Sequence, residues 1–316
     1  MGIAVLAVDL GKTGCRASLR MDGRERRGAE GAGAPGLAAA QGVAAAHRAI
    51  GEVIARIDIP PTGFVLSVGA AGAASAPEAA ADLARRLAGL PHATAVAVTS
   101  DAVTAHAGAL AGEPGVVLAA GTGAVATAVD GAGRFTRVDG WGPFLGDEGG
   151  GGWIGAEGLR AALRCYDGRG PDTPLAAAAQ ARFGELGALP KLFGQHENPA
   201  LLAADFAPAV AAAAAADPIA AGIMREAGQA LARAVLAAID RGGLPAPVPY
   251  AVTGGLIELG AALTDPLNHA LADAVEYRTA RGTPVDGAAL LATDTATALE
   301  PLITRVAPSS PATRIV

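Results

Sequence analysis

Two short turns that contain glycine could hold phosphate groups. Asp9-Leu10-Gly11-Lys12-Thr13 follows an apolar run from Ile3 to Val8, and Gly121-Thr122-Gly123 follows an apolar run from Val116 to Ala120. Glycine lets backbone N–H groups approach an anion closely, and a threonine hydroxyl adds a donor. An aspartate at a strand end can face a metal ion bound to phosphate. Each turn therefore predicts a phosphate site, although a plain strand–turn–strand unit has the same pattern and Lys12 could equally be a solvated turn residue.

A third candidate for chemistry is the carboxylate of Asp101. It follows a strand predicted from Thr94 to Val98 and precedes a helix predicted from Ala102 to Ala111. A residue between a strand and the next helix lies at the carboxyl edge of a sheet, where α/β proteins place their clefts. Asp101 could face such a cleft or only cap the helix, and the residue alone leaves both roles open.

Two further motifs lie between a short predicted strand and the next predicted helix. They read GWG at 140–142 and GDEG at 146–149. The carboxylate of Asp147 can accept two hydrogen bonds at once, which suits hydroxyl groups. Trp141 could contact a ligand or pack in the core, because tryptophan is usually buried for its large apolar area. Glu148 could be a solvated carboxylate or one that begins the helix.

The elements that must position these residues alternate between strands and helices. Further strands are predicted at Cys15–Leu19, Phe64–Val68, Ala124–Val129, Phe135–Val138, Pro249–Thr253 and Val275–Tyr277, and an edge strand with a loop at Arg24–Pro35. Further helices are predicted at Ala38–Ile57, Pro77–Leu90, Gly155–Cys165, Asp217–Asp240, from Ile257, and at Asp286–Leu299. Residues 166–216 are rich in alanine and are predicted to form a helical insertion, and residues 307–316 a tail. Because each glycine turn opens a half of alternating helices and strands, the sequence predicts an α/β fold with two similar domains facing one cleft.

The composition of the 316-residue chain excludes several functional classes. Hydrophobic residues make up 51% and charged residues 17%, which indicates a globular chain. The net charge of −6 disfavours a nucleic-acid groove, and no apolar run is long enough for a membrane span. The first residues lack the basic region of a signal peptide, so we expect a cytoplasmic protein. Cys15 and Cys165 are the only cysteines, which excludes a disulfide framework and a zinc site of several cysteines.

In this order and spacing, the motifs resemble those of the BadF/BadG/BcrA/BcrD ATPase family, within the superfamily of acetate and sugar kinases, Hsc70 and actin. N-acetylglucosamine kinase is the best-known sugar enzyme of this family. The resemblance covers about residues 3–300, and its most specific part is GWG followed by GDEG. The matched residues are Asp9-x-Gly11-x-Thr13, Thr99-Ser100-Asp101-Ala102, Leu118-Ala119-Ala120-Gly121-Thr122-Gly123, Gly140-Trp141-Gly142, Gly146-Asp147-Glu148-Gly149 and Thr253-Gly254-Gly255.

The resemblance implies two actin-like (ribonuclease H-like) α/β domains facing a central cleft. Their expected bounds are residues 1–112 and 113–285, the second with a helical insertion at about 166–216, while residues 286–316 would form a helix that returns to the first domain, plus the tail. It also implies a kinase that uses ATP and Mg²⁺ to phosphorylate a hydroxyl of an amino sugar, N-acetylglucosamine or a glucosamine-like compound. A small-molecule sugar would be its partner, with no nucleic acid and no membrane, and we expect a homodimer.

The resemblance further implies a role for each matched residue. Asp101 would be the catalytic base that accepts the proton of the attacking hydroxyl, and Asp9 would orient Mg²⁺ through water. The nucleotide would be bound by Gly11, Lys12, Thr13, Gly121, Thr122, Gly123, Gly254 and Gly255. The sugar would be bound by Ala71, Gly140, Trp141 and Asp147. Asp147 is expected to lie apart from the phosphate turns.

Departures from the family pattern leave the sugar and two other functions open. Lys12 stands where the family commonly has glycine, and the loop Gly31–Pro35 lacks the asparagine usual in N-acetylglucosamine kinases. The family also contains ATPase activators that hold an iron–sulfur cluster between two subunits through paired cysteines, but neither Cys15 nor Cys165 has a suitable position. A ligand sensor that kept the fold is the other alternative, which the intact Asp101 disfavours.

Overall fold

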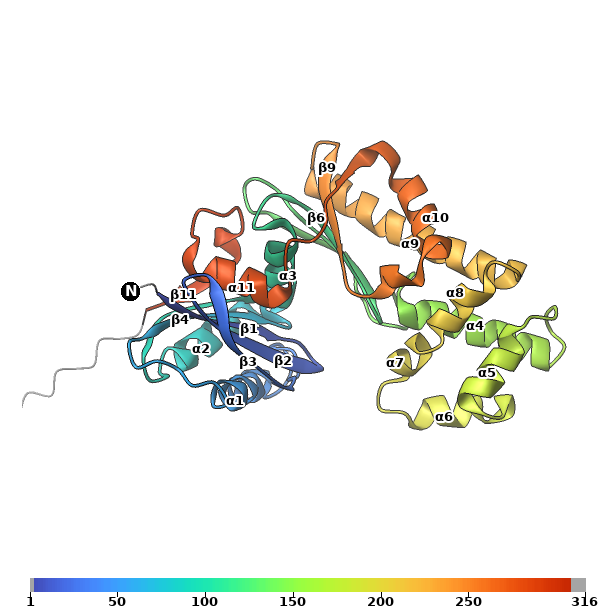
Figure 1. Cartoon of the computed structure of the whole chain (residues 1–316), viewed down its shortest axis with the longest axis horizontal. Helices are drawn as coiled ribbons and strands as arrows, with labels where there is room; N and C mark the ends of the chain where they lie inside the picture. The colour runs from blue at the N-terminus through green and yellow to red at the C-terminus, as the bar shows by residue number, and fades with distance from the viewer. Residues whose placement is uncertain (1–2, 308–316) are drawn as a thin grey trace, which may run out of the picture. The chain divides into compact units, whose positions relative to one another are not determined.

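The computed structural model describes residues 3–307, and the chain divides into two compact units (Figure 1). Unit 1 contains Met1–Pro114, Val129–Phe135 and Thr279–Val316, and unit 2 contains Gly115–Ala128 and Thr136–Arg278. Most of unit 2 is therefore inserted between the first and last parts of unit 1. Each unit is an α/β structure built on its own sheet, as the sequence predicts.

The sheet of unit 1 has six strands in the order β11-β5-β4-β1-β2-β3. The strands are β1 (Ala4–Leu10), β2 (Gly14–Met21), β3 (Arg24–Ala32), β4 (Phe64–Ala70), β5 (Ala93–Ser100) and β11 (Thr304–Val306). β4 is parallel to β1 and β5, whereas β2 is antiparallel to β1 and β11 is antiparallel to β5. The register sets Asp9 of β1 opposite Gly69 of β4, and Gly69 opposite Thr99 of β5. The carboxyl ends of the three parallel strands therefore lie at one edge of the sheet.

Helices cover both faces of this sheet (Figure 1). On one face α1 (Gly42–Ile54) packs against α2 (Pro77–Leu87), and their apolar residues join those of the strands in one core. On the other face α3 (Asp101–Leu110) packs against α11 (Pro284–Thr293), which also contacts β1 and β4. Both sides of the central strands are thus buried, as their continuous apolar sequences predict.

The contact between α3 and α11 is a contact between backbones. A Cβ atom added to Gly287 of α11 would lie 1.9 Å from the carbonyl oxygen of Thr104, and one added to Gly108 of α3 would lie 2.1 Å from the carbonyl oxygen of Thr283. Thr283 caps α11, and its side chain and that of Asp286 form a capping box. Glycine at both positions is therefore required for the close packing of α11 on α3.

The end of unit 1 differs from the sequence prediction. The last helix was expected to reach Leu299, but α11 ends at Thr293, and the amide of Ala296 donates instead to the side chain of Asp294. β-Branched residues and aspartate near this end favour non-helical backbone, which explains the earlier stop. The chain then forms β11, which the sequence did not predict and which Arg305 anchors by pairing with Glu300. Residues 308–316 of the predicted tail lie outside the described residues.

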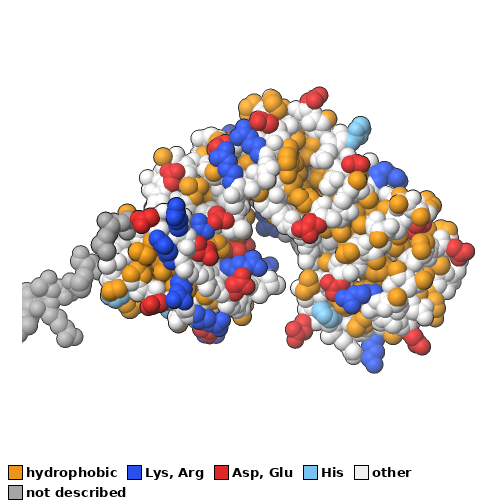
Figure 2. Space-filling view, viewed as in Figure 1, with side chains coloured by type: hydrophobic (Ala, Val, Ile, Leu, Met, Phe, Trp, Pro, Cys, Tyr) orange, Lys and Arg blue, Asp and Glu red, His pale blue; other side chains and the backbone are white. Residues whose placement is uncertain are grey.

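The outer strand β3 is an exposed edge, and it is highly charged. Its first residues read RERR, and Figure 2 shows Lys and Arg side chains over the β2–β3 hairpin of unit 1. Charged side chains on an edge strand oppose pairing with another sheet. The composition of β3 therefore protects the open edge of the unit 1 sheet.

The sheet of unit 2 has five strands in the order β10-β9-β6-β7-β8. The strands are β6 (Gly115–Ala120), β7 (Ala124–Val129), β8 (Phe135–Asp139), β9 (Val248–Thr253) and β10 (Val275–Tyr277). β9 is parallel to both β6 and β10, so the ends of β6 and β9 also lie at one edge. This edge carries the second glycine turn and the Gly254–Gly255 pair.

The helices of unit 2 include the predicted insertion. The longer helices are α4 (Gly151–Tyr166), α9 (Pro218–Gly242) and α10 (Ala261–Leu271), and the shorter ones are α5 (Leu175–Phe183), α6 (Leu189–Gln195), α7 (Pro199–Ala204) and α8 (Ala207–Ala213). α9 begins where predicted, because Asp217 accepts hydrogen bonds from the amides of Ile219 and Ala220 and Pro218 fits the first turn. Among the described residues no single helix is long and apolar enough to cross a membrane, and only the bent pair 199–213 and 218–242 passes that test together.

Alanine at position 287 should destabilise the protein, because its Cβ would overlap a carbonyl oxygen of α3. We expect Gly287→Ala to lower the free energy of unfolding by about 3 kcal/mol, as overpacked sites do. Gly51→Ala in α1 is the matched control, since nothing lies within 4 Å of its added Cβ. That variant should gain about 0.5–1 kcal/mol from helix propensity. Urea unfolding of both variants measures the difference, and equal midpoints would contradict the close contact.

Candidate functional site

The first glycine turn of unit 1 is tight, and its side chains face solvent. The amide of Gly11 donates to the carbonyl of Gly14 at 2.9 Å, which closes the turn between β1 and β2. Gly33 packs directly on it, because an added Cβ would lie 2.5 Å from the carbonyl oxygen of Gly11 and from the backbone carbon of Lys12. Lys12 and Thr13 are exposed. The turn therefore presents a cation, a hydroxyl and backbone groups to a ligand.

Two carboxylates lie beside this turn, on either side of β4. Asp9 is in β1 and Asp101 begins α3 directly after β5, and β4 lies between these two strands. Burial, and then the negative charge of Asp101, raises the pKa of Asp9 to about 6, and Arg16 opposes this rise. The two carboxylates are thus close enough to repel each other.

The cap of α3 is Ser100 rather than Asp101. The side chain of Ser100 accepts a hydrogen bond from the amide of Val103 at 3.2 Å. The carboxylate of Asp101 accepts one from the amide of Ala102 at 3.0 Å, and the residue is half-buried. Because the cap position is already filled, helix capping does not explain the aspartate at 101.

Ala71 contributes its backbone to the same edge of unit 1. Its amide donates to the carbonyl of Leu10, and its carbonyl accepts from the amide of Leu37, both at 2.9 Å. Its own side chain is buried. Ala71 therefore fixes the loop before α1 against the end of β1, and any contact that it makes with a ligand would involve its backbone.

The second glycine turn lies in unit 2 against the start of α4. Its closing bond joins the amide of Gly121 to the carbonyl of Gly123 at 2.9 Å. The first amides of α4, those of Gly151 and Gly152, donate to the carbonyls of Gly121 and Thr122 at 2.8 Å. Gly254 adopts a φ of 89° and lies on Ala120, whose carbonyl oxygen would be 2.2 Å from an added Cβ. The turn, α4 and the Gly254–Gly255 pair thus form one assembly within unit 2.

Asp147 lies against the second turn, so the expectation that it lies apart from both phosphate turns is wrong. Its carboxylate oxygen would be 2.6 Å from a Cβ added to Gly123. Burial raises the pKa of Asp147, a backbone donor at Gly142 lowers it, and the charge of Asp139 raises it. Position 123 has no side chain, and this lets the carboxylate approach the turn, a contact that sequence spacing does not reveal.

Two residues that the sequence analysis missed hold the GWG–GDEG loop. Asp139 has a φ of 62°, and its carboxylate accepts from the amides of Asp147 at 2.8 Å and Glu148 at 3.0 Å. Arg137 donates to the carbonyls of Asp139 and Gly140. The only signal in the sequence is the Asp139-Gly140 pair, which is typical of turns.

The side chains of this loop are mainly exposed. Trp141 is 68% exposed, which contradicts the alternative that it packs in the core, and Phe144 is 94% exposed. Glu148 forms an exposed ion pair with Arg233 of α9 at 3.8 Å. The loop thus presents an aromatic ring with an apolar face and, through Asp147, a carboxylate that can accept hydrogen bonds.

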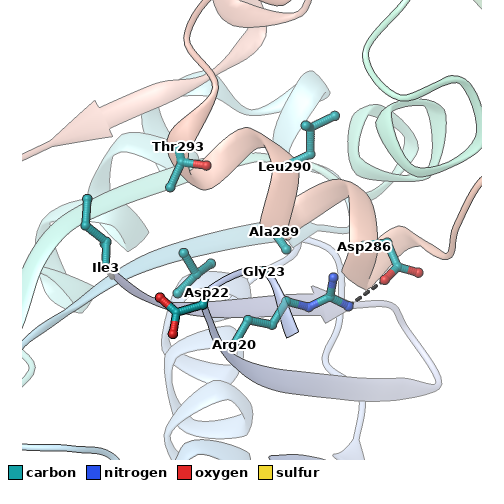
Figure 3. A pocket seen from close by; sticks show the side chains of 9 residues that line it. Ile3, Arg20, Asp22, Gly23, Asp286, Ala289, Leu290 and Thr293 are labelled. Atoms are coloured by element: carbon teal, nitrogen blue, oxygen red, sulfur yellow. Dashed lines mark hydrogen bonds and ion pairs between the residues drawn. The ribbon is translucent and has the colours of Figure 1, made fainter. Parts of the chain in front are cut away.

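A groove of about 530 Å³ in unit 1 lies outside these two groups of residues (Figure 3). The β2–β3 turn, with Asp22 and Gly23, and helix α11 line it. Arg20 reaches across to Asp286 and lies 4.0 Å from Glu25. Because Arg20 is paired within its own unit, we interpret the groove as the place where β2 is linked to the start of α11.

The structure thus brings the predicted residues together in two groups, one in each unit. Asp9, the 11–13 turn, Ala71 and Asp101 share one edge in unit 1, and the remaining predicted residues share one edge in unit 2. No cluster of three or more His, Cys, Asp or Glu side chains that could hold a metal ion occurs among residues 3–307. The carboxylates of Asp9 and Asp101 fit Mg²⁺ nonetheless, since carboxylate oxygens are common ligands of Mg²⁺ and a cation would offset the charge of Asp101, which adds to burial in raising the pKa of Asp9.

Comparison with known proteins gives a consistent result. The model of the BadF/BadG/BcrA/BcrD ATPase family matches residues 6–292. A proposed N-acetylglucosamine kinase from Chromobacterium violaceum has a similar structure, with 27% identity, coverage of 92% of this chain and 99% of that chain, and a TM-score of 0.74. No curated protein sequence matches the chain.

Two more distant structures are similar in fold. A proposed N-acetylglucosamine kinase from Porphyromonas gingivalis is 19% identical, with coverage of 91% of this chain and 98% of that chain and a TM-score of 0.65. A glucokinase of the ROK family from Streptomyces griseus, in complex with glucose and AMPPNP, is 18% identical, with coverage of 91% and 98% and a TM-score of 0.56. The predicted α/β fold of the actin-like sugar kinases is therefore confirmed.

Replacing Asp9 by asparagine should stabilise the protein at neutral pH but not in acid. In the folded protein the pKa of Asp9 is about 6 instead of 3.8. Protonation of Asp9 therefore contributes fully to the free energy of unfolding below about pH 4, and this contribution is lost as the pH rises through 6. At about 1.4 kcal/mol per pKa unit the loss is about 3 kcal/mol. Asp9→Asn should recover it at pH 7.5 and change little at pH 4.

Urea unfolding at both pH values measures this difference. Asp58→Asn, at an exposed position, is the control and should change stability at neither pH. An equal gain for Asp9→Asn at both pH values would show that the ionisation of Asp9 is not the cause.

Proposed function

Because the chain belongs to the BadF/BadG/BcrA/BcrD ATPase family, we propose that it is an ATP-dependent kinase that phosphorylates a hydroxyl of an amino sugar of the N-acetylglucosamine or glucosamine type. The observation that carries this proposal is the half-buried carboxylate of Asp101, placed beside Asp9 and the first glycine turn. Ser100 holds the cap position of α3, so the carboxylate of Asp101 is not needed as the cap.

Catalysis of phosphoryl transfer requires mainly that the protein position the reacting groups, stabilise charge and place one base near the nucleophile. Asp101 would accept the proton of the sugar hydroxyl as that hydroxyl attacks the outer phosphate of ATP. Gly11, Lys12 and Thr13 in unit 1, and Gly121–Gly123 in unit 2, would hold the phosphates through backbone amides, a hydroxyl and a charge. Gly254–Gly255 would lie near the adenosine.

Magnesium would be held by Asp9 through water. Bound Mg²⁺ would neutralise part of the charge on the phosphates, which is its general function in such enzymes. Asp9 suits a position in the outer coordination sphere of the ion, because the residue lies within β1 and its backbone is paired with β2 and β4.

The sugar would be bound by Asp147, Trp141 and the backbones of Gly140 and Ala71. Asp147 can accept two hydroxyl hydrogen bonds, and the exposed ring of Trp141 offers an apolar face. We propose a cytoplasmic homodimer with a role in carbohydrate metabolism, and its net charge of −6 suits neither nucleic acid nor an anionic membrane.

The cysteines argue against an iron–sulfur ATPase activator. Cys15 is buried in β2, and burial followed by the charge of Asp9 raises the pKa of its thiol to about 11, which disfavours the thiolate that a cluster needs. Cys165 lies 3.9 Å from Asp172 at the end of α4. A colourless purified protein would agree with a kinase, whereas the absorbance of a cluster would favour the activator.

A coupled assay of ADP release tests the proposed activity. We expect ADP release with Mg·ATP that depends on one or more sugars from a panel of N-acetylglucosamine, glucosamine, N-acetylmuramic acid and hexoses. A lack of stimulation by any of them, combined with tight sugar binding, would favour a ligand sensor instead.

Asp101→Asn should lower kcat by about 10²-fold or more and leave ATP binding nearly unchanged, because a general base is removed. Ser100→Ala is the matched control: it removes the cap of α3 at a cost of about 1 kcal/mol in stability but should retain kcat. Steady-state kinetics and ATP titration measure both variants. Comparable turnover in Asp101→Asn and the wild type would exclude Asp101 as the base.

Asp147→Asn should raise the KM for the sugar strongly and change kcat less, because an interaction with hydroxyls that do not react is weakened. The loss of a charged acceptor predicts a rise on the order of tenfold to 10²-fold. Asparagine preserves the shape that packs on Gly123, so the KM for ATP should change little. A collapse of ATP affinity with an unchanged KM for the sugar would move Asp147 to the nucleotide site.

A further inference from the structure

The loop between β8 and α4 is anchored at its end, where Gly149 packs on Ala227 and Leu231 of α9, but its residues 140–146 place few side chains in the core of unit 2. It begins after Asp139 and ends before Gly151, and the side chains of Trp141, Phe144 and Leu145 are 68%, 94% and 85% exposed. Its own backbone bonds are local, such as those from the amides of Leu145 and Gly146 to the carbonyl of Gly142. Polar contacts must therefore fix the conformation of residues 140–146.

Asp139 joins the beginning of the loop to its end. One carboxylate oxygen accepts from the amide of Asp147 at 2.8 Å and lies 3.5 Å from the amide of Trp141, and the other accepts from the amide of Glu148 at 3.0 Å. A Cβ added to Gly146 would lie 2.2 Å from the same carboxylate and 3.0 Å from the Cβ of Trp141. The loop is thus wrapped around this side chain. The φ of 62° at Asp139, a conformation that aspartate tolerates better than most residues, turns the carboxylate inward.

Arg137 holds the other side of the same turn. Its guanidinium donates to the carbonyl of Asp139 at 3.1 Å and to the carbonyl of Gly140. The same guanidinium carbon lies 5.6 Å from the centre of the Trp141 ring, a distance typical of a cation–π contact. Arg137 therefore restrains both the backbone before Trp141 and the ring itself.

We propose that Asp139 and Arg137 are positioning residues for sugar recognition, Asp139 setting the separation of Trp141 from Asp147 and Arg137 setting the orientation of the Trp141 ring. Neither residue touches the sugar in this proposal. It rests on the proposed function, because Trp141 and Asp147 are the groups that would contact the substrate. Preorganisation of this kind lowers the free energy that ligand binding must spend on ordering the site.

A first measurement needs no sugar. The chain has two tryptophans, so Trp153→Phe leaves Trp141 as the only fluorophore of its kind. In that background Asp139→Ala and Arg137→Met should each lower the fluorescence anisotropy of Trp141 and increase its quenching by acrylamide. Arg137→Lys, which keeps the charge, should restore much of the signal. Asp167→Ala, which removes a carboxylate paired with its neighbour Arg169 on the surface of unit 2, is the matched control and should change neither property.

The second measurement separates KM from kcat in the same variants. Asp139→Ala and Arg137→Met should raise the sugar KM about tenfold, which corresponds to about 1.4 kcal/mol, with kcat and the KM for ATP within about twofold of the parent. Thermal unfolding checks that the variants remain folded. Lower anisotropy of Trp141 with an unchanged sugar KM would overturn the proposal. Unchanged anisotropy and unchanged acrylamide quenching of Trp141 in these variants would overturn it as well.

Failure of the proposed function and failure of the positioning roles give different results. If the parent protein neither binds nor phosphorylates any sugar, the proposed function fails and the sugar-positioning role fails with it, even where Trp141 is loosened as expected. If the parent phosphorylates a sugar and the variants match it, the proposed function stands and only the roles of Asp139 and Arg137 are wrong.

Discussion

Two like charges at one edge of a sheet are the constraint on which unit 1 depends. Asp9 lies in β1 and Asp101 follows β5, on either side of β4, and the charge of Asp101 adds to the effect of burial on the pKa of Asp9. Burial raises the pKa of Asp9 and opposes folding at neutral pH. A site that tolerates such repulsion is well prepared for a cation or for a proton, and this is the property that a phosphoryl-transfer site requires.

In unit 2 the main constraint is the close approach of backbone segments. The second glycine turn, the start of α4, Asp147 and Gly254 are in contact because no side chain intervenes at Gly123, Gly151 or Gly254. The first amides of α4 donate to carbonyls of the turn, so the turn is hydrogen-bonded directly to the start of the helix. The many glycines in this region are therefore explained by contacts between backbones as much as by ligand binding.

The sequence allowed prediction of most strands, the long helices and both glycine turns, because apolar runs and the Pro77 and Asp217-Pro218 starts are local signals. It did not predict β11, a three-residue strand whose partner β5 lies about two hundred positions earlier. The sequence also did not predict the cap at Ser100, the exposure of Trp141 or the wrapping of a loop around Asp139. These features depend on which groups meet in space, and residue types alone do not decide that.

Because most of unit 2 is inserted between the first and last parts of unit 1, the two units can become compact at different times during synthesis. A growing chain makes β1–β5 and α3 first, but the part of the sheet around Ala7 that packs on Val285 and Ala288 lacks this partner until α11 has left the ribosome. Unit 2 is complete at Arg278, before that happens. Unit 2 can therefore become compact while unit 1 is unfinished, and any chain that stops before Pro284 retains an uncovered apolar sheet, a substrate for chaperones and proteases.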